Sequence, residues 1–293
     1  MGTSTGEAQA VISLVVLSLL SVWEALAPDH RRPTGVLRRW TRNVAVGGIG
    51  ILFTHAIPGA TLLAASAWGR SRGIGLLSGL PSPWAAVLMV PVLDLAVWAQ
   101  HRASHSWPWL WRLHRVHHGD RALDLSTAFR FHPMELGVSL VWKAFAVLLL
   151  GGPTIGVLVF EALLQAGNLF EHANIRLPAS VDQILRWVLV TPRIHAIHHS
   201  VHVHDQRSNY GFFLSAWDRM FCTYRAPSAD EGPLAIGLGD NQEHSLLAML
   251  LQPLDPQPLE RTRSLTDARV SRFSSPGTSL PEGPRTVTAR APL

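Results

Sequence analysis

Long apolar segments alternate with shorter polar ones over the first 170 residues of the chain. The candidate membrane spans are residues 9–27, 43–66, 84–100 and a longer stretch over 136–170. A helix rises about 1.5 Å per residue, so a straight helix over the last stretch would exceed a bilayer core of about 30 Å. Gly151, Gly152 and Pro153 interrupt that stretch, which predicts a helical hairpin or a span followed by a broken helix. The pattern predicts an all-α, multi-span membrane protein.

Composition agrees with a membrane class, because 47% of the residues are hydrophobic, only 15% are charged and the mean hydropathy is +0.18. The first apolar segment is expected to be a retained helix rather than a signal peptide, since residues 1–10 contain Glu7 and no Lys or Arg. The formal net charge is +5, but the arginines lie beside apolar spans and do not alternate with aromatic residues. We therefore expect no nucleic-acid partner.

The basic residues predict the orientation of the chain. The loop between the first two predicted spans contains Arg31, Arg32, Arg38, Arg39 and Arg42, whereas the next loop contains Arg70 and Arg72. The positive-inside rule then places the first loop in the cytoplasm. Counting crossings from there brings the chain back to the cytoplasmic face near residue 100 and again after the hairpin. The expected architecture is a set of spans beneath a cytoplasmic, histidine-rich helical cap.

Three regions follow from this reading of the chain. Residues 1–92 form the N-terminal transmembrane helices, residues 93–225 a catalytic region that includes the hairpin, and residues 226–293 a C-terminal extension. Beyond about residue 261 the chain is rich in Ser, Thr, Pro and Arg, a composition that predicts disorder because it cannot bury a core.

Three histidine clusters border the apolar segments. They comprise His101 and His105, then His114, His117 and His118, and then His195, His198 and His199. A random chain of this composition would contain about 0.04 matches to H-x-x-H-H, whereas this one contains two. Neutral imidazole is the commonest side-chain ligand of transition metals, so the clusters predict a polynuclear metal site. Cys222 is the only cysteine, which leaves nitrogen and oxygen as the ligand atoms.

Helical spacing suggests how the clusters divide between two ions. Residues four apart lie on one face of a helix, as His101 and His105 do. In each H-x-x-H-H motif the first and third histidines are also four apart, while the middle one is rotated by about 100° and can serve a second ion. Each cluster of three can therefore bridge two metals.

Further candidates adjoin the clusters. Asn168 and His172 are again four residues apart, at the end of the last apolar stretch, and His172 is expected to be a ligand. Asn168 is expected to form hydrogen bonds or a water-mediated contact.

His132 is a candidate ligand or supporting residue, and so is Glu135 in the same short segment. Asp94 precedes His101 by seven residues on the same side of the span, so its carboxylate could either orient an imidazole or pack between helices. His202 and His204 are expected on the surface.

The ligand set argues against a zinc hydrolase, because the chain has no His-Glu-x-x-His motif and more imidazoles than one tetrahedral zinc uses. A dinuclear centre that uses dioxygen matches nitrogen-rich ligation beside a membrane, because lipid C–H bonds are inert to acid-base attack.

Residues from Asp94 to Tyr224 resemble the membrane-bound fatty acid hydroxylase and sterol desaturase superfamily. The resemblance rests on the three clusters, on Phe131-His-Pro-Met-Glu135, on Phe170-Glu-His-Ala-Asn174, and on the segments Asn209-Tyr210-Gly211 and Leu214–Phe221. It implies a cytoplasmic site in which the histidines hold two iron ions and dioxygen hydroxylates or desaturates a lipid. A separate ferredoxin, cytochrome or reductase would supply electrons, since no G-x-G-x-x-G fingerprint is present.

Other functions compete with this one. A carotenoid hydroxylase or ketolase uses similar clusters on a polyene substrate. A membrane metal transporter or sensor would place its ligands along a path inside the spans, whereas these gather at span ends. A structural membrane protein has no need of four repeats of the i, i+4 spacing.

Overall fold

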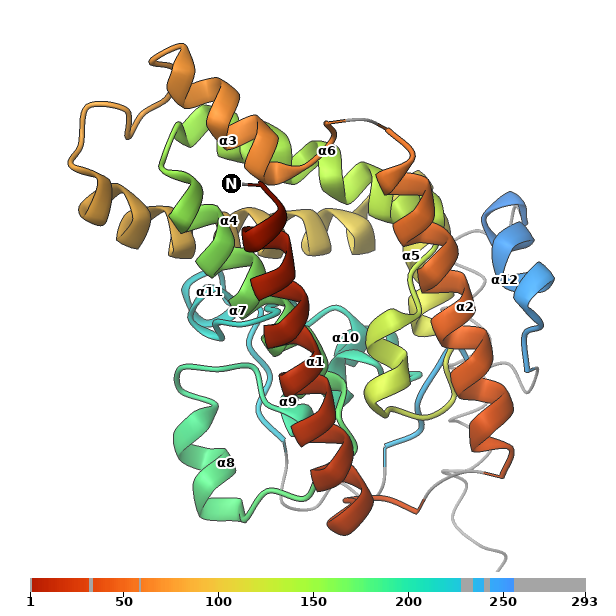
Figure 1. Ribbon diagram of the computed structural model, residues 1–293. Helices are drawn as coiled ribbons and strands as arrows, with labels where there is room; N and C mark the ends of the chain where they lie inside the picture. Colours follow the sequence, from red (N-terminus) through yellow and green to blue (C-terminus); the bar gives the residue numbers. More distant parts are fainter. Residues whose placement is uncertain (1, 32–33, 58, 228–233, 240–242, 256–293) are drawn as a thin grey trace, which may run out of the picture.

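A computed structural model describes residues 2–31, 34–57, 59–227, 234–239 and 243–255 (Figure 1). The predicted disorder beyond residue 261 lies outside these residues. Within them the chain is helical, and extended pairing is limited to two isolated bridges. The predicted all-α class is therefore confirmed. The elements are α1 Gly2–Leu26, α2 Val36–His55, α3 Leu62–Ser71, α4 Ser82–Ser106, α5 Pro108–His118, η1 Leu125–Phe129, α6 Pro133–Leu150, α7 Thr154–His172, α8 Ala179–Leu185, α9 Pro192–His198, α10 Val203–Gln206, α11 Ala216–Met220, α12 Leu246–Leu251 and η2 Gln252–Leu254.

Within the described ranges, four helices are long and apolar enough to cross a membrane, which is typical of an integral membrane protein. They are Gln9–Leu26 of α1, Ser82–Ser106, Pro133–Leu150 and Thr154–His172. At about 1.5 Å per residue, the 25 residues of α4 span about 37 Å, which exceeds a hydrocarbon core of about 30 Å. Its last turns, with His101 and His105, therefore have room to extend past the apolar layer.

The single span predicted over 43–66 is wrong. Helix α2 ends at His55 and α3 begins at Leu62, and neither is among the four helices of membrane-spanning length and composition. Gly59 has a φ of +74°, which a helix cannot accommodate, and the Thr61 hydroxyl accepts a hydrogen bond from the Ala64 amide and so starts α3. The apolar composition of the segment concealed this break.

The predicted hairpin is confirmed. Gly151 ends α6 in the left-handed conformation (φ +65°), and Pro153 precedes the first residue of α7. A Cβ atom on Gly151 would lie 1.9 Å from the carbonyl oxygen of Ile74, so only glycine allows the turn to approach the segment after α3 this closely.

The helices pack around three apolar cores, the smallest of which joins Val46, Val116 and Met249. Residues of α3, α4, α6 and α7 form one core, which includes Met89, Leu93 and Phe160. Residues of α1, η1 and α7 form the other, which includes Leu125 and Leu169. In Figure 1, α1 lies beside α7, and the last part of α2 crosses the start of α6. These contacts bring the polar end of α4, the end of α7 and the short helices α5 and α9 together.

Candidate metal centre

The three histidine clusters and His172 meet in two buried groups. Within each group, one ring nitrogen from every member lies within 4.8 Å of those of the others. The first group contains His101, His105, His114, His118 and His198, and the second contains His117, His172, His195 and His199. All nine side chains are buried. Each group has enough neutral nitrogen donors to hold one transition-metal ion.

The division between the groups follows helical spacing. His114 and His118 point from one face of α5 into the first group, while His117 points into the second. At α9 the roles are exchanged, because His195 and His199 enter the second group and the middle histidine enters the first. Helices α5 and α9 each contribute to both groups, so the two groups are neighbours.

Backbone carbonyls orient three of the rings. Nδ1 of His101 donates to the Tyr210 carbonyl at 2.8 Å, and Nδ1 of His198 donates to the Ser208 carbonyl at 2.7 Å. Nδ1 of His172 donates to the carbonyl of Asn168 at 2.7 Å. A carbonyl oxygen only accepts hydrogen bonds, so Nδ1 carries the proton in these rings and Nε2 keeps its lone pair. The three rings are thus set in the tautomer that coordinates through Nε2.

The Nε2 atoms converge. In the first group, Nε2 of His114 lies 3.0 Å from Nε2 of His101 and 3.2 Å from that of His118. In the second, Nε2 atoms are 3.1, 3.0 and 3.1 Å apart along the series His117, His172, His195 and His199. Two nitrogens bound at right angles to one ion by bonds of about 2.1 Å lie about 3.0 Å apart. The spacing matches ligands that share an ion.

Several ring nitrogens have no hydrogen-bond partner among the described residues. They are Nε2 of His105 and His198, and Nδ1 of His117, His118, His195 and His199. Burial, the largest cause in each case, lowers the pKa of the five rings outside the spans well below its ordinary value, namely those of His117, His118, His195, His198 and His199. These rings are therefore neutral, the state in which imidazole binds metals.

Two buried carboxylates adjoin the groups. The Oε1 atom of Glu135 lies 2.6 Å from Nδ1 of His114, so this predicted candidate orients a histidine of the first group. Glu171 was missed by the sequence analysis. Its carboxylate lies 3.5 Å from Nδ1 of His195 and 3.7 Å from Nδ1 of His172, and neither oxygen has a hydrogen-bond partner in the described part of the chain. Its position next to His172 was the available signal.

The remaining candidates lie outside the two groups. His132 precedes α6, where its Nδ1 accepts a hydrogen bond from the Met134 amide and its Nε2 lies 3.2 Å from the Leu250 carbonyl. The Asn168 side chain donates to the Ala128 carbonyl at 3.0 Å. His202 is half-buried and His204 is exposed, as expected.

Asp94 binds the segment after the last cluster rather than an imidazole. It accepts hydrogen bonds from the Leu214 amide at 3.2 Å and from the Trp217 indole at 2.8 Å. Asp218, which the sequence analysis also missed, accepts bonds from the amides of Tyr210 and Gly211 at 2.9 and 2.8 Å. These two aspartates hold the segment whose carbonyls orient His101 and His198.

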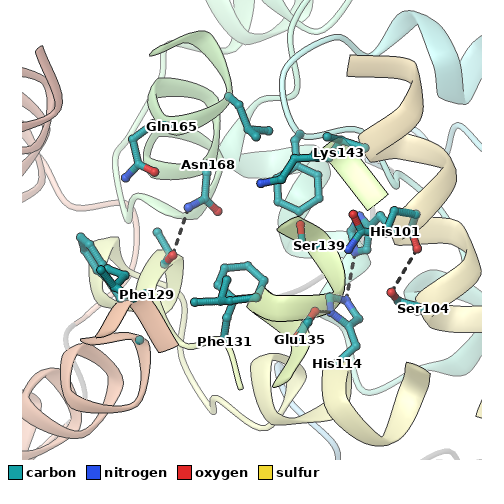
Figure 2. Close-up of a pocket in the computed structure, with 18 residues that line it drawn as sticks. His101, Ser104, His114, Phe129, Phe131, Glu135, Ser139, Lys143, Gln165 and Asn168 are labelled. Carbon is teal, nitrogen blue, oxygen red and sulfur yellow. Dashed lines mark hydrogen bonds and ion pairs between the residues drawn. The ribbon is translucent and has the colours of Figure 1, made fainter. Parts of the chain in front are cut away.

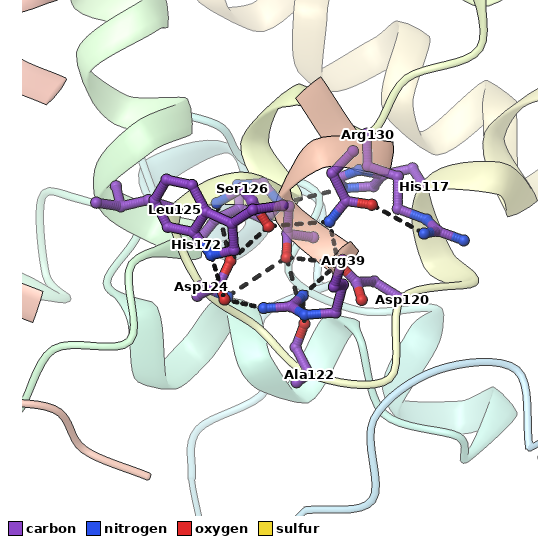
Figure 3. A network of polar contacts seen from close by, with 12 residues as sticks. Arg39, His117, Asp120, Ala122, Asp124, Leu125, Ser126, Arg130 and His172 are labelled. Carbon is purple, nitrogen blue, oxygen red and sulfur yellow. Dashed lines mark hydrogen bonds and ion pairs between the residues drawn. The ribbon is translucent and has the colours of Figure 1, made fainter. Parts of the chain in front are cut away.

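A polar network supports the second group from the α2 side (Figure 3). Arg39 forms ion pairs with Asp120, at 2.7 Å, and with Asp124, and Asn43 donates to Asp120 at 2.8 Å. Burial opposes ionisation of Asp120, but Arg39 and Arg130 outweigh it and hold the pKa of this carboxyl below its ordinary value. The loop that follows His117 and His118 is thereby fixed to α2.

A cavity of about 220 Å³ lies beside the first group, between α2, α4, α6 and α7. Figure 2 shows His101 and His114 on one side and Gln165 and Asn168 on the other. Much of the wall is apolar, with Ile51, Val97, Phe131, Leu136, Leu164 and Phe212. The arrangement can place an apolar group against the histidines of the first group.

Fold and site together define a helical membrane protein with two adjacent histidine groups able to hold metal. Residues 86–223, which include all nine histidines, match the fatty acid hydroxylase family.

Three known proteins are similar to this chain in sequence. The ornithine lipid hydroxylase OlsE of Rhizobium tropici is 28% identical over 173 residues, which is 59% of this chain and 51% of that protein. The alkylglycerol monooxygenase of Homo sapiens is 28% identical over 221 residues, 73% of this chain and 46% of that protein. A cholesterol 25-hydroxylase-like protein of Danio rerio is 26% identical over 144 residues, 48% of this chain and 55% of that protein. The chain thus spans about half the length of each of these relatives. No solved structure matches it.

Proposed function

We propose that the protein is a membrane-bound di-iron enzyme that uses dioxygen to hydroxylate a lipid. The observation that carries the proposal is the pair of buried histidine groups, which are joined through α5 and α9 and of which the first borders a pocket with a largely apolar wall. The family match and the names of the relatives, which are lipid hydroxylases and a monooxygenase, support the same chemistry. The histidine motifs are shared by hydroxylases and desaturases, but the names of the relatives favour hydroxylation.

The nine histidines are the proposed iron ligands, five in one group and four in the other. Their buried nitrogens and the unpartnered atoms among them fit bound metal cations. When bound, the irons supply the activation of dioxygen that an inert C–H bond requires.

Residues of the chain itself orient the ligand rings, line the pocket and exclude water. The Tyr210 carbonyl orients the ring of His101, and the Glu135 carboxylate orients that of His114. Both histidines line the pocket. Burial of all nine rings keeps bulk water from the reacting atoms. In the balanced reaction one oxygen atom enters the C–H bond and the other leaves as water, with two electrons and two protons. A separate ferredoxin, cytochrome or reductase supplies the electrons.

We place the site on the cytoplasmic face. The crossing count that first suggested this side relied on the span over 43–66, which the structure lacks. A direct contact supports it instead, because Arg39 of the basic segment binds Asp120, two residues after His118. Cys222, the only cysteine, is exposed, and it lies three residues before the end of the predicted catalytic region 93–225, so its labelling shows on which side of the membrane this region lies. A membrane-impermeant maleimide should label it only after intact cells are permeabilised. Labelling in intact cells would contradict this placement.

Metal analysis and lipid mass spectrometry test the function. Purified protein should contain two irons per chain, and cells that express it should accumulate a lipid 16 Da heavier, whose added oxygen derives from ¹⁸O₂. A product 2 Da lighter would indicate desaturation instead. His117→Ala and His198→Ala, one variant per group, should lose iron and turnover, whereas His204→Ala, an exposed control, should keep both. Full iron and full turnover in the first two variants would refute the proposal.

The alternatives have less support. A metal transporter needs ligands along a path, but here the nine rings are closed off from solvent in one place. A carotenoid hydroxylase or ketolase remains a distinct outcome of the lipid analysis, because its product would be an oxygenated polyene.

A further inference from the structure

The chain contains 25 basic residues, and a single one of them is lysine. That residue, Lys143, lies in the middle of α6, within the candidate span Pro133–Leu150, and its side chain lines the pocket. An ammonium group at membrane depth is costly unless a partner offsets its charge, and such groups therefore mark binding or transport sites.

Lys143 has no charged partner in direct contact among the described residues. It forms no hydrogen bond or ion pair there. Glu161 of α7 is the acidic group that attracts it, but this carboxylate accepts a hydrogen bond from Gln9 at 2.7 Å and forms no ion pair with Lys143. Figure 2 shows the lysine side chain directed into the space between α6 and α7.

The row of pocket residues on α6 sets the distance from this charge to the metal centre. Glu135, Ser139 and Lys143 are four residues apart and line the pocket from one helix face. Glu135 contacts His114, so Lys143 lies eight residues, or about 12 Å along the helix, from the first histidine group. The Trp142 indole donates to the Ala96 carbonyl at 2.8 Å and fixes this part of α6 to α4.

Acceptor atoms also line the pocket. Oε1 of Gln100, Oδ1 of Asn168 and Oε2 of Glu135 are buried without hydrogen-bond partners among the residues described. These oxygens repel an anion, whereas Lys143 attracts one. An anionic group in the pocket is thus directed to the lysine, and the part of the ligand that lies beside the histidines is uncharged.

We propose that the pocket binds the carboxylate or phosphate of an anionic lipid against Lys143 and holds a nearby carbon beside His101 and His114. This inference rests on the proposed function for its reaction but not for its binding step. The cavity of about 220 Å³ is smaller than the 300 Å³ or more typical of whole-ligand sites, so the rest of the lipid extends into the bilayer. Oxidation then falls within about 12 Å of the anionic group, not at the far end of a long acyl chain.

Binding is measured on the purified, iron-loaded full chain without an electron donor, so that no turnover occurs. Oleate, phosphatidic acid and oleyl alcohol are the carboxylate, phosphate and uncharged probes. The wild type should prefer one or both anions, and Lys143→Met should weaken anion binding about tenfold or more while leaving the alcohol unaffected. Lys143→Arg should retain most of the preference, and Arg72→Met, which removes an exposed arginine outside the pocket, should behave as the wild type.

Two further measurements keep the test decisive if Lys143→Met fails to fold. Isotope-labelled lysine gives one side-chain NMR signal in the wild type, and this signal should shift on adding the anion but not the alcohol. In the double variant Lys143→Ser with Ser139→Lys, the ammonium moves one turn, about 5.4 Å, towards the histidines, and the hydroxyl of the product should move towards the anionic end.

Equal binding of anions and alcohol, an unshifted lysine signal or an unchanged product carbon would overturn the inference. Anion binding through Lys143 without any oxidised product would instead refute the proposed function alone.

Discussion

Asp218 offers the most direct test of how the structure holds its histidines. This buried carboxylate accepts hydrogen bonds from the Trp98 indole at 3.0 Å, the Tyr210 amide at 2.9 Å, the Gly211 amide at 2.8 Å and the Thr223 hydroxyl at 2.6 Å. A hydrogen bond to a charged group contributes about 1.5–3 kcal/mol. Because water reaches some of the freed donors, we expect Asp218→Ala to lower the free energy of unfolding by about 4–6 kcal/mol.

The isosteric variant should lose less. In Asp218→Asn one oxygen still accepts the bonds to Trp98, Tyr210 and Thr223, while the new amide group opposes the Gly211 amide. The expected loss is about 2 kcal/mol. Asp29→Asn removes a carboxylate from an exposed pair with Arg176, at 3.6 Å, and should change stability by about 0.5 kcal/mol or less.

Thermal unfolding in lipid nanodiscs and iron analysis measure these effects. A loss of 4–6 kcal/mol lowers the unfolding temperature by roughly 10 °C or more in a chain of this size. Iron content should fall in the same order, alanine below asparagine, because the freed segment includes the carbonyl that orients His101. If Asp218→Ala melts within about 2 °C of the wild type and keeps its iron, the argument from this hydrogen-bond network is wrong.

Three other substitutions probe separate features. Glu135→Gln removes the carboxylate beside His114 and should weaken metal affinity about 10- to 100-fold in chelator competition, and wild-type affinity would contradict the orienting role. Glu171→Gln removes a buried charge that no hydrogen bond offsets, so it should raise the unfolding temperature of the metal-free protein but weaken metal binding. A variant in which the unfolding temperature and the metal affinity both rise, or both fall, would contradict this prediction. Gly47→Ala places a Cβ atom 2.2 Å from the Phe129 carbonyl oxygen and should lower the free energy of unfolding by about 1–3 kcal/mol. At Gly48 nothing lies within 4 Å, so Gly48→Ala should stabilise α2 by about 0.5–1 kcal/mol. Similar thermal shifts for the two variants would refute the packing of α2 on η1.

Local periodicity explains which parts of the site the sequence could predict. The separation of His117 from His114 and His118 depends only on the 100° turn per residue within α5, and the same holds for α9. The hairpin was also readable, because glycine and proline act on their own stretch of backbone. The break between α2 and α3 was missed because average hydrophobicity over 43–66 outweighed the turn signal at Gly59.

Tertiary contacts explain the rest. Glu171 is adjacent to His172 in sequence, but its value to the site comes from His195, which belongs to another helix. Asp218 acts on a loop whose carbonyls reach His101, more than a hundred residues earlier. No spacing within one segment carries this information. His132 was a candidate ligand because it lies near the clusters in sequence. In the structure its position directly before α6 makes it the N-terminal cap of that helix.

The ligands come from α4, α5, α7 and the end of α9, so the groups exist only after the hairpin, the short helices and the last segment have docked. Without metal, six ring nitrogens and Glu171 are buried with no hydrogen-bond partner among the described residues, each at a cost of about 1–3 kcal/mol. The packing that creates the groups is therefore partly opposed by the groups themselves. Bound cations turn this cost of burial into a stabilising contribution, because they supply a partner for the nitrogens and a counter-charge for the carboxylate. Metal binding and assembly of the helices are thus a single coupled equilibrium.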